Sequence, residues 1–401
     1  MGPLAGIRVI ELAQQVAGPY CGKLLADLGA DVVKVEPPGS GDACRTEEPF
    51  KNGVAGSDRS GLFLYLNANK LGVTLDLRQS NARTVLMDLL ETADVLIDSF
   101  DPLSSLELGF DYDTLHSLFP RLVVTAITPY GQTGPRSTWK GTELTLWNAS
   151  GYGLLTPAGA REEEELPLHP HCAQVAYLSA ANAAGATMAA LLDRELNGDG
   201  QLVDVSEQET MIAALSPQLA DFFYDGNVVW SRSHPRLNTM RFLPCKDGYI
   251  SLLLTQADQW DRLQEWMGNP DWLAAIEYRG TQGMTQNWDV ISFMLSDWFA
   301  DKTKQEIFAA GQAHHIPIGP VSSIAETVDS PHLAERGYFV EVEHPVAGTL
   351  KTPGAPYRFS RSPWQIRTPA PALGQHNQEI YGGRLDYTAE RIEVLREAGI
   401  I

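Results

Sequence analysis

Near its start the chain reads Ile7-Arg8-Val9-Ile10-Glu11-Leu12, continues through residues 18–29, and then reads Asp31-Val32-Val33-Lys34-Val35-Glu36. The first and last of these segments are rich in β-branched residues, which favour strands. The segment between them has apolar residues at helical spacing. This order predicts a βαβ unit, in which two parallel strands are joined by a helix packed across them.

The same alternation continues through the first half of the chain. Further strands are expected at residues 72–77, 95–98, 122–127 and 202–205, and helices at residues 82–93, 112–118 and 177–192. Strands that alternate with helices indicate a parallel sheet covered on both faces. The predicted fold class is therefore α/β, with a Rossmann-like parallel sheet.

A second, smaller α+β domain is expected where the character of the sequence changes. Lys246-Asp247-Gly248-Tyr249-Ile250 predicts a hairpin, and helical segments rich in tryptophan follow it. The tail has short strands, several prolines and a last helix at residues 389–398. We expect a large domain made of residues 1–205 and 330–401, and a linker and small domain made of residues 206–329.

The composition limits the partners that the protein can have. The 401 residues include 50 acidic and 30 basic ones, which gives a formal net charge of −20. This charge repels nucleic acid and anionic membrane surfaces. We find no basic and apolar leader, no apolar run of about 20 residues, and no CxxC pair among the four cysteines. These features predict a cytoplasmic protein with reduced thiols, no membrane anchor and no nucleic-acid partner.

Two motifs suggest ligands only at first sight. Gly18-Pro19-Tyr20-Cys21-Gly22-Lys23 has three residues between its glycines and a leucine after its lysine, whereas a phosphate loop needs four residues and Ser or Thr. What remains is a strand-to-helix turn, whose free N–H groups can hold an anionic ligand. His169-Pro170-His171 and His314-His315 lack the companion ligands of a zinc site, so no metal is expected.

A denser set of motifs resembles one known family. It begins with Leu4-Ala5-Gly6-Ile7-Arg8-Val9-Ile10-Glu11-Leu12 and extends over residues 25–42. It resumes at Leu66-Asn67-Ala68-Asn69-Lys70 and at Gly198-Asp199-Gly200-Gln201, and it persists to residues 395–401. In order and spacing these motifs resemble the class III CoA-transferases, the group that includes formyl-CoA transferase and carnitine CoA-transferase.

The resemblance implies a fold and a reaction. The large domain would be built from both ends of the chain, and two protomers would interlock like the links of a chain in an obligate dimer. The family moves CoA from a thioester to a free carboxylate. An aspartate attacks the acyl-CoA, forms a mixed anhydride and then carries CoA as an aspartyl thioester, which divides one difficult exchange into easier steps.

This chain departs from the family at that aspartate. Counting back from the end of the following helix places the equivalent position at Ala176, and alanine is no nucleophile. No Asp or Glu occurs anywhere in residues 166–192, and the nearby polar residues are Gln174 and Tyr177. The resemblance therefore implies no catalytic residue of the family type in this chain.

The CoA-binding side is only partly kept. Where relatives often read Asn-Phe-Arg-Pro-Gly, this chain reads Ser99-Phe100-Asp101-Pro102-Leu103, which places an anion where CoA phosphates usually lie. A related branch racemises 2-methylacyl-CoA esters with a histidine, and this chain has Gly141-Thr142-Glu143 at that place. By resemblance, five residues match CoA-contacting positions and form the expected cofactor-binding set: Val16, Ala17, Leu66, Lys70 and Lys140.

Two-subunit members of the family exist in which only one subunit keeps the aspartate, as in the benzylsuccinate CoA-transferase of anaerobic toluene degradation. The resemblance implies that this chain is such a non-catalytic subunit. It would complete the fold and pocket of a homologous catalytic subunit, in a heterodimer that moves CoA from an acyl-CoA such as succinyl-CoA to an acid such as benzylsuccinate. Two alternatives stay open: a CoA-dependent hydratase or isomerase with other catalytic residues, and a homodimeric acyl-CoA-binding protein.

Overall fold

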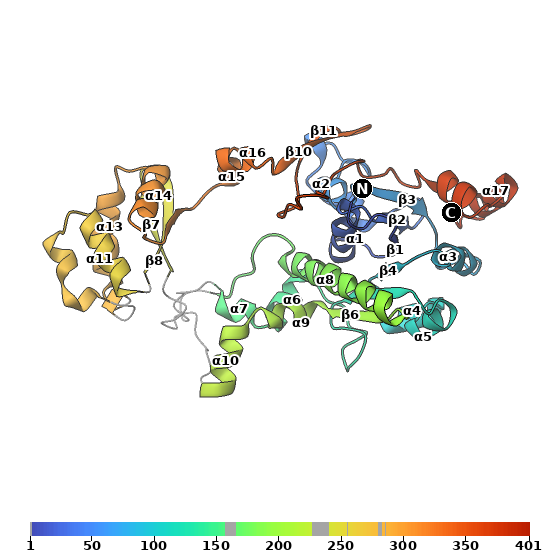
Figure 1. The fold of residues 1–401 in the computed structure, drawn as a ribbon, viewed down its shortest axis with the longest axis horizontal. Coiled ribbons are helices and arrows are strands. Elements are labelled where there is room, and N and C mark those ends of the chain that lie inside the picture. The colour runs from blue at the N-terminus through green and yellow to red at the C-terminus, as the bar shows by residue number, and fades with distance from the viewer. Residues whose placement is uncertain (1, 157–165, 227–239, 255, 280–282, 285) are drawn as a thin grey trace. The chain divides into compact units, whose positions relative to one another are not determined.

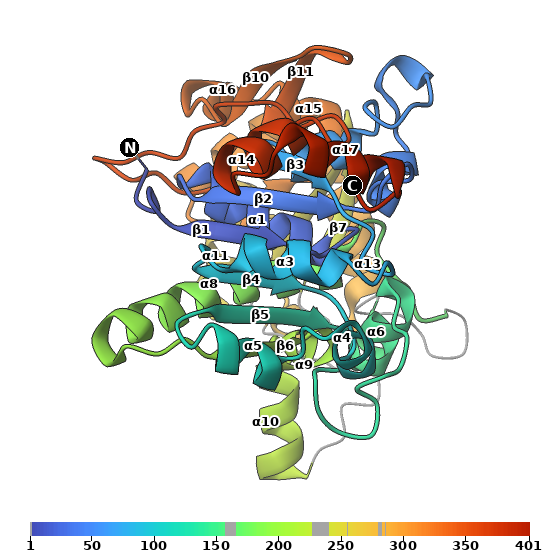
Figure 2. The ribbon, with the colours of Figure 1, turned by 90° about the vertical axis from the view of Figure 1, so that its right-hand side faces the viewer.

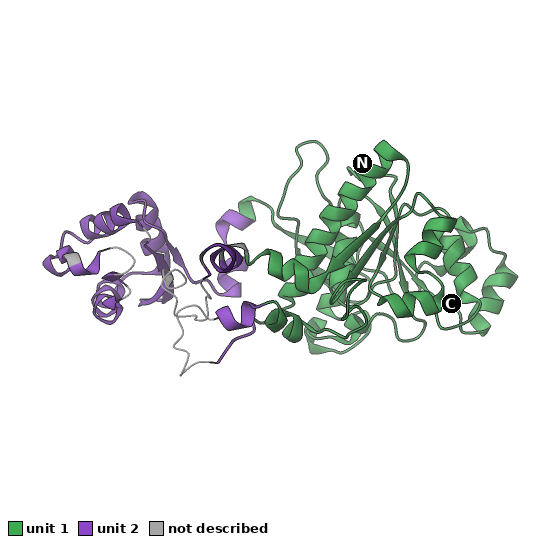
Figure 3. Ribbon diagram, turned by 90° about the horizontal axis from the view of Figure 1, so that it is seen from below, with its two compact units in different colours: residues 1–150, 170–216, 334–401 green, residues 151–169, 217–333 purple. Residues whose placement is uncertain are grey.

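A computed structural model describes residues 2–156, 166–226, 240–254, 256–279, 283–284 and 286–401. The chain divides into two compact units, which Figure 3 shows in two colours. Unit 1 comprises residues 1–150, 170–216 and 334–401, and unit 2 comprises residues 151–169 and 217–333. Both ends of the chain thus belong to unit 1. The domain boundaries expected from the sequence, residues 1–205 with 330–401 and residues 206–329, stay a prediction.

A six-stranded sheet forms the centre of unit 1. All its neighbouring strands are parallel, and their spatial order is β3-β2-β1-β4-β5-β6 (Figure 2). The strands are β1 (Arg8–Glu11), β2 (Asp31–Glu36), β3 (Lys70–Thr74), β4 (Val95–Asp98), β5 (Val123–Thr128) and β6 (Leu202–Ser206). This confirms the predicted α/β class. The direction of winding reverses between β1 and β4, which is where such sheets bind ligands.

Helices cover both faces of this sheet, so its strands are buried on both sides. On one face Val85, Leu115 and Ile392 pack in the same apolar cluster as Val33 and Leu96 of the sheet. These residues come from α3 (Ala82–Leu90), α5 (Tyr112–Leu118) and α17 (Ala389–Glu397). Figure 2 shows these helices in front of the strands. Each fully buried aliphatic side chain contributes about 1.5–3 kcal/mol through its removal from water.

The opposite face is covered by α1 (Ala17–Asp27) and the long α8 (Gln174–Asn197). Cys21 and Leu25 of α1 and Ala183 of α8 are buried in one cluster with Ile97 of the sheet. Small alanine side chains let α8 lie close to α1. By length and composition α8 could also cross a membrane, but a core helix of this kind passes the same test.

The remaining elements of unit 1 connect this framework. β10 (Phe339–His344) and β11 (Gly348–Pro353) form an antiparallel hairpin (Figure 1). The short helices are α2 (Gly61–Leu66), α4 (Pro102–Leu108), α6 (Glu143–Ala149) and α9 (Glu207–Ala213), with tighter or wider helical turns at Ala43–Thr46, Lys51–Gly53 and Gln378–Arg384. Helices α6, α8 and α9 pack against one another, and this packing matters for the site.

Unit 2 has its own small sheet and its own core. The sheet is antiparallel, in the order β7-β8-β9, and its first two strands form the predicted hairpin around Lys246. Trp260 and Phe299 lie in its core, where the Trp260 Nε1–H donates to the carbonyl of Leu273 at 3.1 Å. Its elements are α7 (Tyr152–Leu155), α10 (Ser216–Asp225), β7 (Met240–Cys245), β8 (Gly248–Leu253), α11 (Ala257–Trp266), α13 (Trp288–Phe299), α14 (Lys304–Ala313), β9 (Ile318–Pro320), α15 (Ile324–Val328) and α16 (Pro331–Glu335), with turns at Asp271–Ala274 and Ile276–Tyr278. Helix α10 begins in unit 1, and α16 ends in it.

Candidate functional site

A cavity of about 660 Å³ lies in unit 1 at the carboxyl ends of the strands, and we call it the strand-end cavity. Its walls come from the segments that follow β1, β2, β4, β5 and β6, together with the first turn of α8. The lining residues used below are Val16, Ala17, Glu47, Asp101, Lys140, Glu143, Ala176 and Glu207. This is the position at which open α/β sheets with this strand order bind their ligands.

A buried ion network holds the wall of the strand-end cavity in place. The Lys34 ammonium lies 3.0 Å from a Glu11 oxygen and 2.7 Å from an Asp42 oxygen, and all three side chains are fully buried. Burial alone would lower the pKa of Lys34, but Asp42 and Glu11 outweigh it and raise that pKa. Asp42 also accepts a hydrogen bond of 2.9 Å from the backbone N–H of Gln15. The network thereby joins the segment after β1 to the segment after β2.

The first turn of α8 carries Ala176, the residue that the sequence resemblance predicts at the position of the family's aspartate. Ala173, which precedes this helix, has no side chain that could accept from its N–H groups. Glu143 of α6 takes that role, because its carboxylate accepts from the N–H of Val175 at 2.8 Å and from that of Ala176 at 3.4 Å. The positive end of a helix stabilises a carboxylate at this place. A carboxylate thus reaches the backbone of Ala176, although it comes from another helix.

A second carboxyl group, that of Glu207, lines the same cavity. Glu207 is the first residue of α9, directly after β6 ends. Burial, with the negative charge of Glu143 as a smaller cause, raises the pKa of Glu207 to about 7. Glu207 is absent from the site residues predicted from the sequence. Its place directly after a strand was the available signal, since the carboxyl ends of parallel strands meet at one edge.

Asp101, which the sequence resemblance places where relatives often have an arginine, caps a helix. Its carboxylate caps α4 by accepting from the N–H groups of Leu103 and Ser104 and from the Ser104 hydroxyl. Burial acts in the opposite direction, but these hydrogen bonds, with a smaller effect of the Lys140 charge, lower the pKa of Asp101. Part of the negative charge that faces the cavity is therefore already balanced by the helix.

The structure brings together only some of the predicted CoA-contacting residues. Val16, Ala17 and Lys140 line the strand-end cavity, as does Ala176. Leu66 and Lys70 are buried and do not line it, and their contact with CoA stays a prediction.

The Lys70 ammonium lies 2.7 Å from Glu11 and donates to the Pro19 carbonyl at 2.8 Å. Burial lowers the pKa of Lys70 to about 8 against the opposing effect of Glu11. Of the polar residues near Ala176, Gln174 is exposed, while the ring of Tyr177 packs edge-on against Tyr20 with 4.8 Å between centroids.

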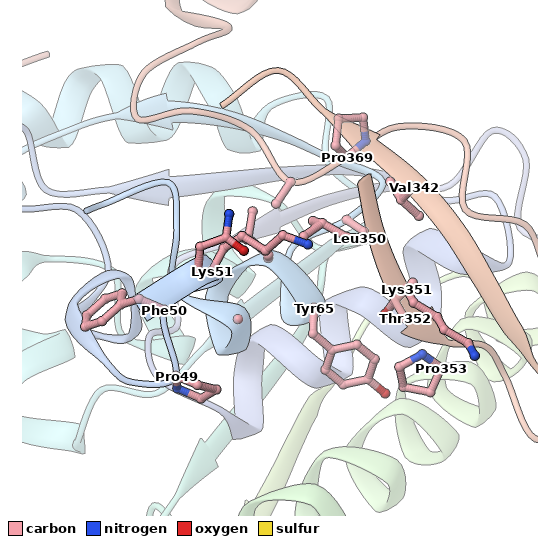
Figure 4. Close-up of a pocket in the computed structure, with 15 residues that line it drawn as sticks. Pro49, Phe50, Lys51, Tyr65, Val342, Leu350, Lys351, Thr352, Pro353 and Pro369 are labelled. Carbon is pink, nitrogen blue, oxygen red and sulfur yellow. The ribbon is translucent and has the colours of Figure 1, made fainter. Parts of the chain in front are cut away.

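A second cavity in unit 1, of about 430 Å³, lies between α2 and β11 (Figure 4). Its lining is mostly apolar and includes Tyr65 and Leu350 but no His, Cys, Asp or Glu. The Lys51 ammonium at its edge donates to the Thr349 carbonyl at 2.7 Å. This cavity therefore lacks the carboxyl groups that the strand-end cavity has, and its titratable side chains are those of Lys51, Tyr65 and Lys351. Among the residues that the structure describes, no group of three or more His, Cys, Asp or Glu is placed to hold a metal.

A doubly wound sheet with a ligand-sized cavity at its switch point defines a protein of the coenzyme-binding α/β class. The chain belongs to CoA-transferase family III, whose family model matches residues 4–377. The family resemblance seen in the sequence is thereby confirmed. Membership also implies that CoA thioesters are the substrates of this fold.

Individual relatives agree with this assignment. The chain is 28% identical to the succinyl-CoA:glutarate CoA-transferase of Mus musculus, over 100% of this chain and 91% of that protein. It is 30% identical to the BbsE subunit of the succinyl-CoA:(R)-benzylsuccinate CoA-transferase of Thauera aromatica, over 98% of this chain and 97% of that subunit. A solved structure of a CAIB/BAIF family protein from Brucella suis matches with a TM-score of 0.83 and 25% identity, covering 96% of this chain and 100% of that one.

Proposed function

We propose that this chain is the non-catalytic subunit of a two-subunit class III CoA-transferase. The observation that carries the proposal is Ala176, which lines the strand-end cavity in the first turn of α8, where the family's nucleophile is expected. A methyl group can form neither the mixed anhydride nor the aspartyl thioester. The transfer of CoA from an acyl-CoA, such as succinyl-CoA, to an acid of the benzylsuccinate kind would then take place on a homologous partner that keeps the aspartate.

The chain retains what a structural partner needs. Unit 1 has a six-stranded sheet with helices packed on both faces, and the buried network around Lys34 joins two of the segments that line the cavity. The similarity to BbsE, a protein that is itself named as a subunit, supports a heteromeric assembly. In this proposal the chain stabilises the partner's fold and contributes to its acyl pocket.

The test is native mass spectrometry of the complex purified from its host, followed by incubation with acyl-CoA. We expect a second chain of similar mass and a covalent CoA adduct on that second chain only. A homodimer, or an adduct on this chain, would overturn the proposal.

A second candidate function is a CoA-dependent hydratase or isomerase. The carboxyl groups of Glu143 and Glu207 favour it, because both line the cavity beside Ala176 and one has a pKa near neutrality, as general acid–base catalysts need. This function predicts that the purified chain alone adds water to an unsaturated acyl-CoA or isomerises it. Turnover should then fall at least about a hundredfold in Glu207→Gln.

A further inference from the structure

The strand-end cavity is unusually acidic for one that receives an anionic substrate. Its lining includes four carboxyl side chains, those of Glu47, Asp101, Glu143 and Glu207, and one cation, Lys140. CoA-transferase relatives of this chain are named for succinyl-CoA, whose acyl group carries a free carboxylate of its own. Such a group needs a cation or several hydrogen-bond donors when it leaves water.

The four carboxyl groups differ in how strongly they act on a bound acyl group. Glu47 is exposed, so solvent screens its charge. Asp101 caps α4, and Glu143 accepts two N–H groups of α8, so helix ends balance part of both charges. Glu207 remains as the largely buried carboxyl group on the wall that α6, α8 and α9 form together.

We infer that the strand-end cavity accepts acyl thioesters whose acyl group has no free carboxylate and disfavours those that have one, and that Glu207 sets this preference. The inference deepens the proposed function, on which it rests, by naming the class of acyl-CoA that this subunit holds in its own cavity. A transfer that uses succinyl-CoA is then left to the partner's cavity.

The physical reason is repulsion between like charges in a partly dry cavity. An acyl group that enters beside Ala176 lies in the same cavity that Glu143 and Glu207 line. A repulsion that costs about 1.4 kcal/mol corresponds to a tenfold loss of affinity. Two like charges about 10 Å apart repel by about this much at an effective dielectric constant of about 20.

The same charges predict how the preference depends on pH. Since the pKa of Glu207 is about 7, this carboxyl group is mostly ionised at about pH 8 and mostly neutral at about pH 6. A neutral Glu207 donates a hydrogen bond in place of repelling. The preference for an uncharged acyl group should therefore narrow as the pH falls.

The test compares butyryl-CoA with succinyl-CoA, which have acyl chains of the same length but differ in the terminal carboxylate. The purified native complex is titrated with each thioester, and the slowing of amide hydrogen exchange in α6 and α9 of this chain reports occupancy of this cavity alone. We expect butyryl-CoA to bind about tenfold more tightly than succinyl-CoA at about pH 8 and about two- to threefold more tightly at about pH 6.

Glu207→Gln keeps the side-chain shape and removes the charge, so it should reduce the tenfold preference at about pH 8 to about the value at pH 6. Glu209→Gln is the matched control, because Glu209 belongs to the same helix but is exposed and does not line the cavity. The pH series on the unmodified chain tests the inference even where the variant does not fold.

Three results would overturn the inference: equal or tighter binding of succinyl-CoA at the higher pH, an unchanged preference in Glu207→Gln, or no protection of this chain by either thioester. None of these results bears on whether a second chain with the aspartate copurifies. Failure of the inference and failure of the proposed function are therefore distinguishable.

Discussion

Replacing Ala176 by aspartate would introduce the residue that the family resemblance predicts there into a cavity already lined by four carboxyl side chains. The new carboxylate would start in the first turn of α8, beside the N–H groups that donate to Glu143, and would enter the cavity that Glu207 also lines. The helix N-terminus would stabilise it by about 0.3–1 kcal/mol. Two like charges about 5 Å apart at an effective dielectric constant of about 20 repel by about 3 kcal/mol. Repulsion should therefore outweigh the effect of the helix.

We expect Ala176→Asp to lower the free energy of unfolding by about 2 kcal/mol at about pH 8, and by less than about 1 kcal/mol at about pH 6, where Glu207 holds a proton. Urea denaturation at one fixed protein concentration measures both values, since the stability of an oligomer depends on concentration. Adding Glu207→Gln to Ala176→Asp should recover about half of the loss at the higher pH.

The matched control is Ala176→Asn, which has the shape of aspartate without its charge. Its stability should be nearly independent of pH between these two conditions. Equal stability of Ala176→Asp and Ala176→Asn at about pH 8 would refute the reasoning, because it would mean that the acidic wall exerts no electrostatic effect on position 176.

Three further predictions follow from the buried charges and the caps. Lys34→Met leaves the buried carboxylates of Glu11 and Asp42 without their shared cation. It should therefore lower the free energy of unfolding, measured by urea denaturation, by about 3–5 kcal/mol. A loss below about 1 kcal/mol would contradict the network's role. For Glu207 the folded pKa of about 7 exceeds the usual 4.5 of the unfolded chain, so the folded state holds more protons between these values and its stability falls as the pH rises. Glu207→Gln should remove about 3 kcal/mol of that decline, and an unchanged pH profile would contradict the assignment. Asp101→Ala should lower the free energy of unfolding by about 0.5–2 kcal/mol, because α4 loses its cap. Asp101→Asn should keep the cap and, because it removes a charge from the cavity, strengthen CoA binding in a direct titration. Weaker CoA binding by Asp101→Asn would count against this interpretation.

The framework of unit 1 could be predicted from the sequence because buried parallel strands are nearly continuous runs of Val, Ile and Leu. The predicted strands at residues 31–36 and 95–98 match β2 and β4 residue for residue. The predicted helix at residues 112–118 matches α5 in the same way. Strand-to-helix alternation also predicted the parallel sheet, and the switch point follows once its strand order is known.

The chemistry around Ala176 could not be predicted in the same way. Acidic residues are missing from the stretch of chain around position 176, whereas the carboxylate that reaches this backbone belongs to Glu143, 33 residues away. Lys70 shows the converse problem, because a lysine at the start of a strand gave no sign that it is buried against Glu11. Pairings of this kind depend on how helices and strands pack, and no local pattern encodes them.

The charge around Ala176 also bears on the missing nucleophile. An aspartate that attacks a thioester must be ionised, and a second buried carboxylate beside it would raise its pKa and keep more of it protonated. In this chain position 176 carries a methyl group, so Glu207 has no aspartate to act on there. From the proposed function we therefore predict that the partner subunit, which would have to keep its aspartate ionised, has an uncharged side chain where this chain has Glu207. Sequencing the copurified subunit tests this directly, and a partner with both the aspartate and an acidic residue at the position of Glu207 would show that the two groups are compatible after all.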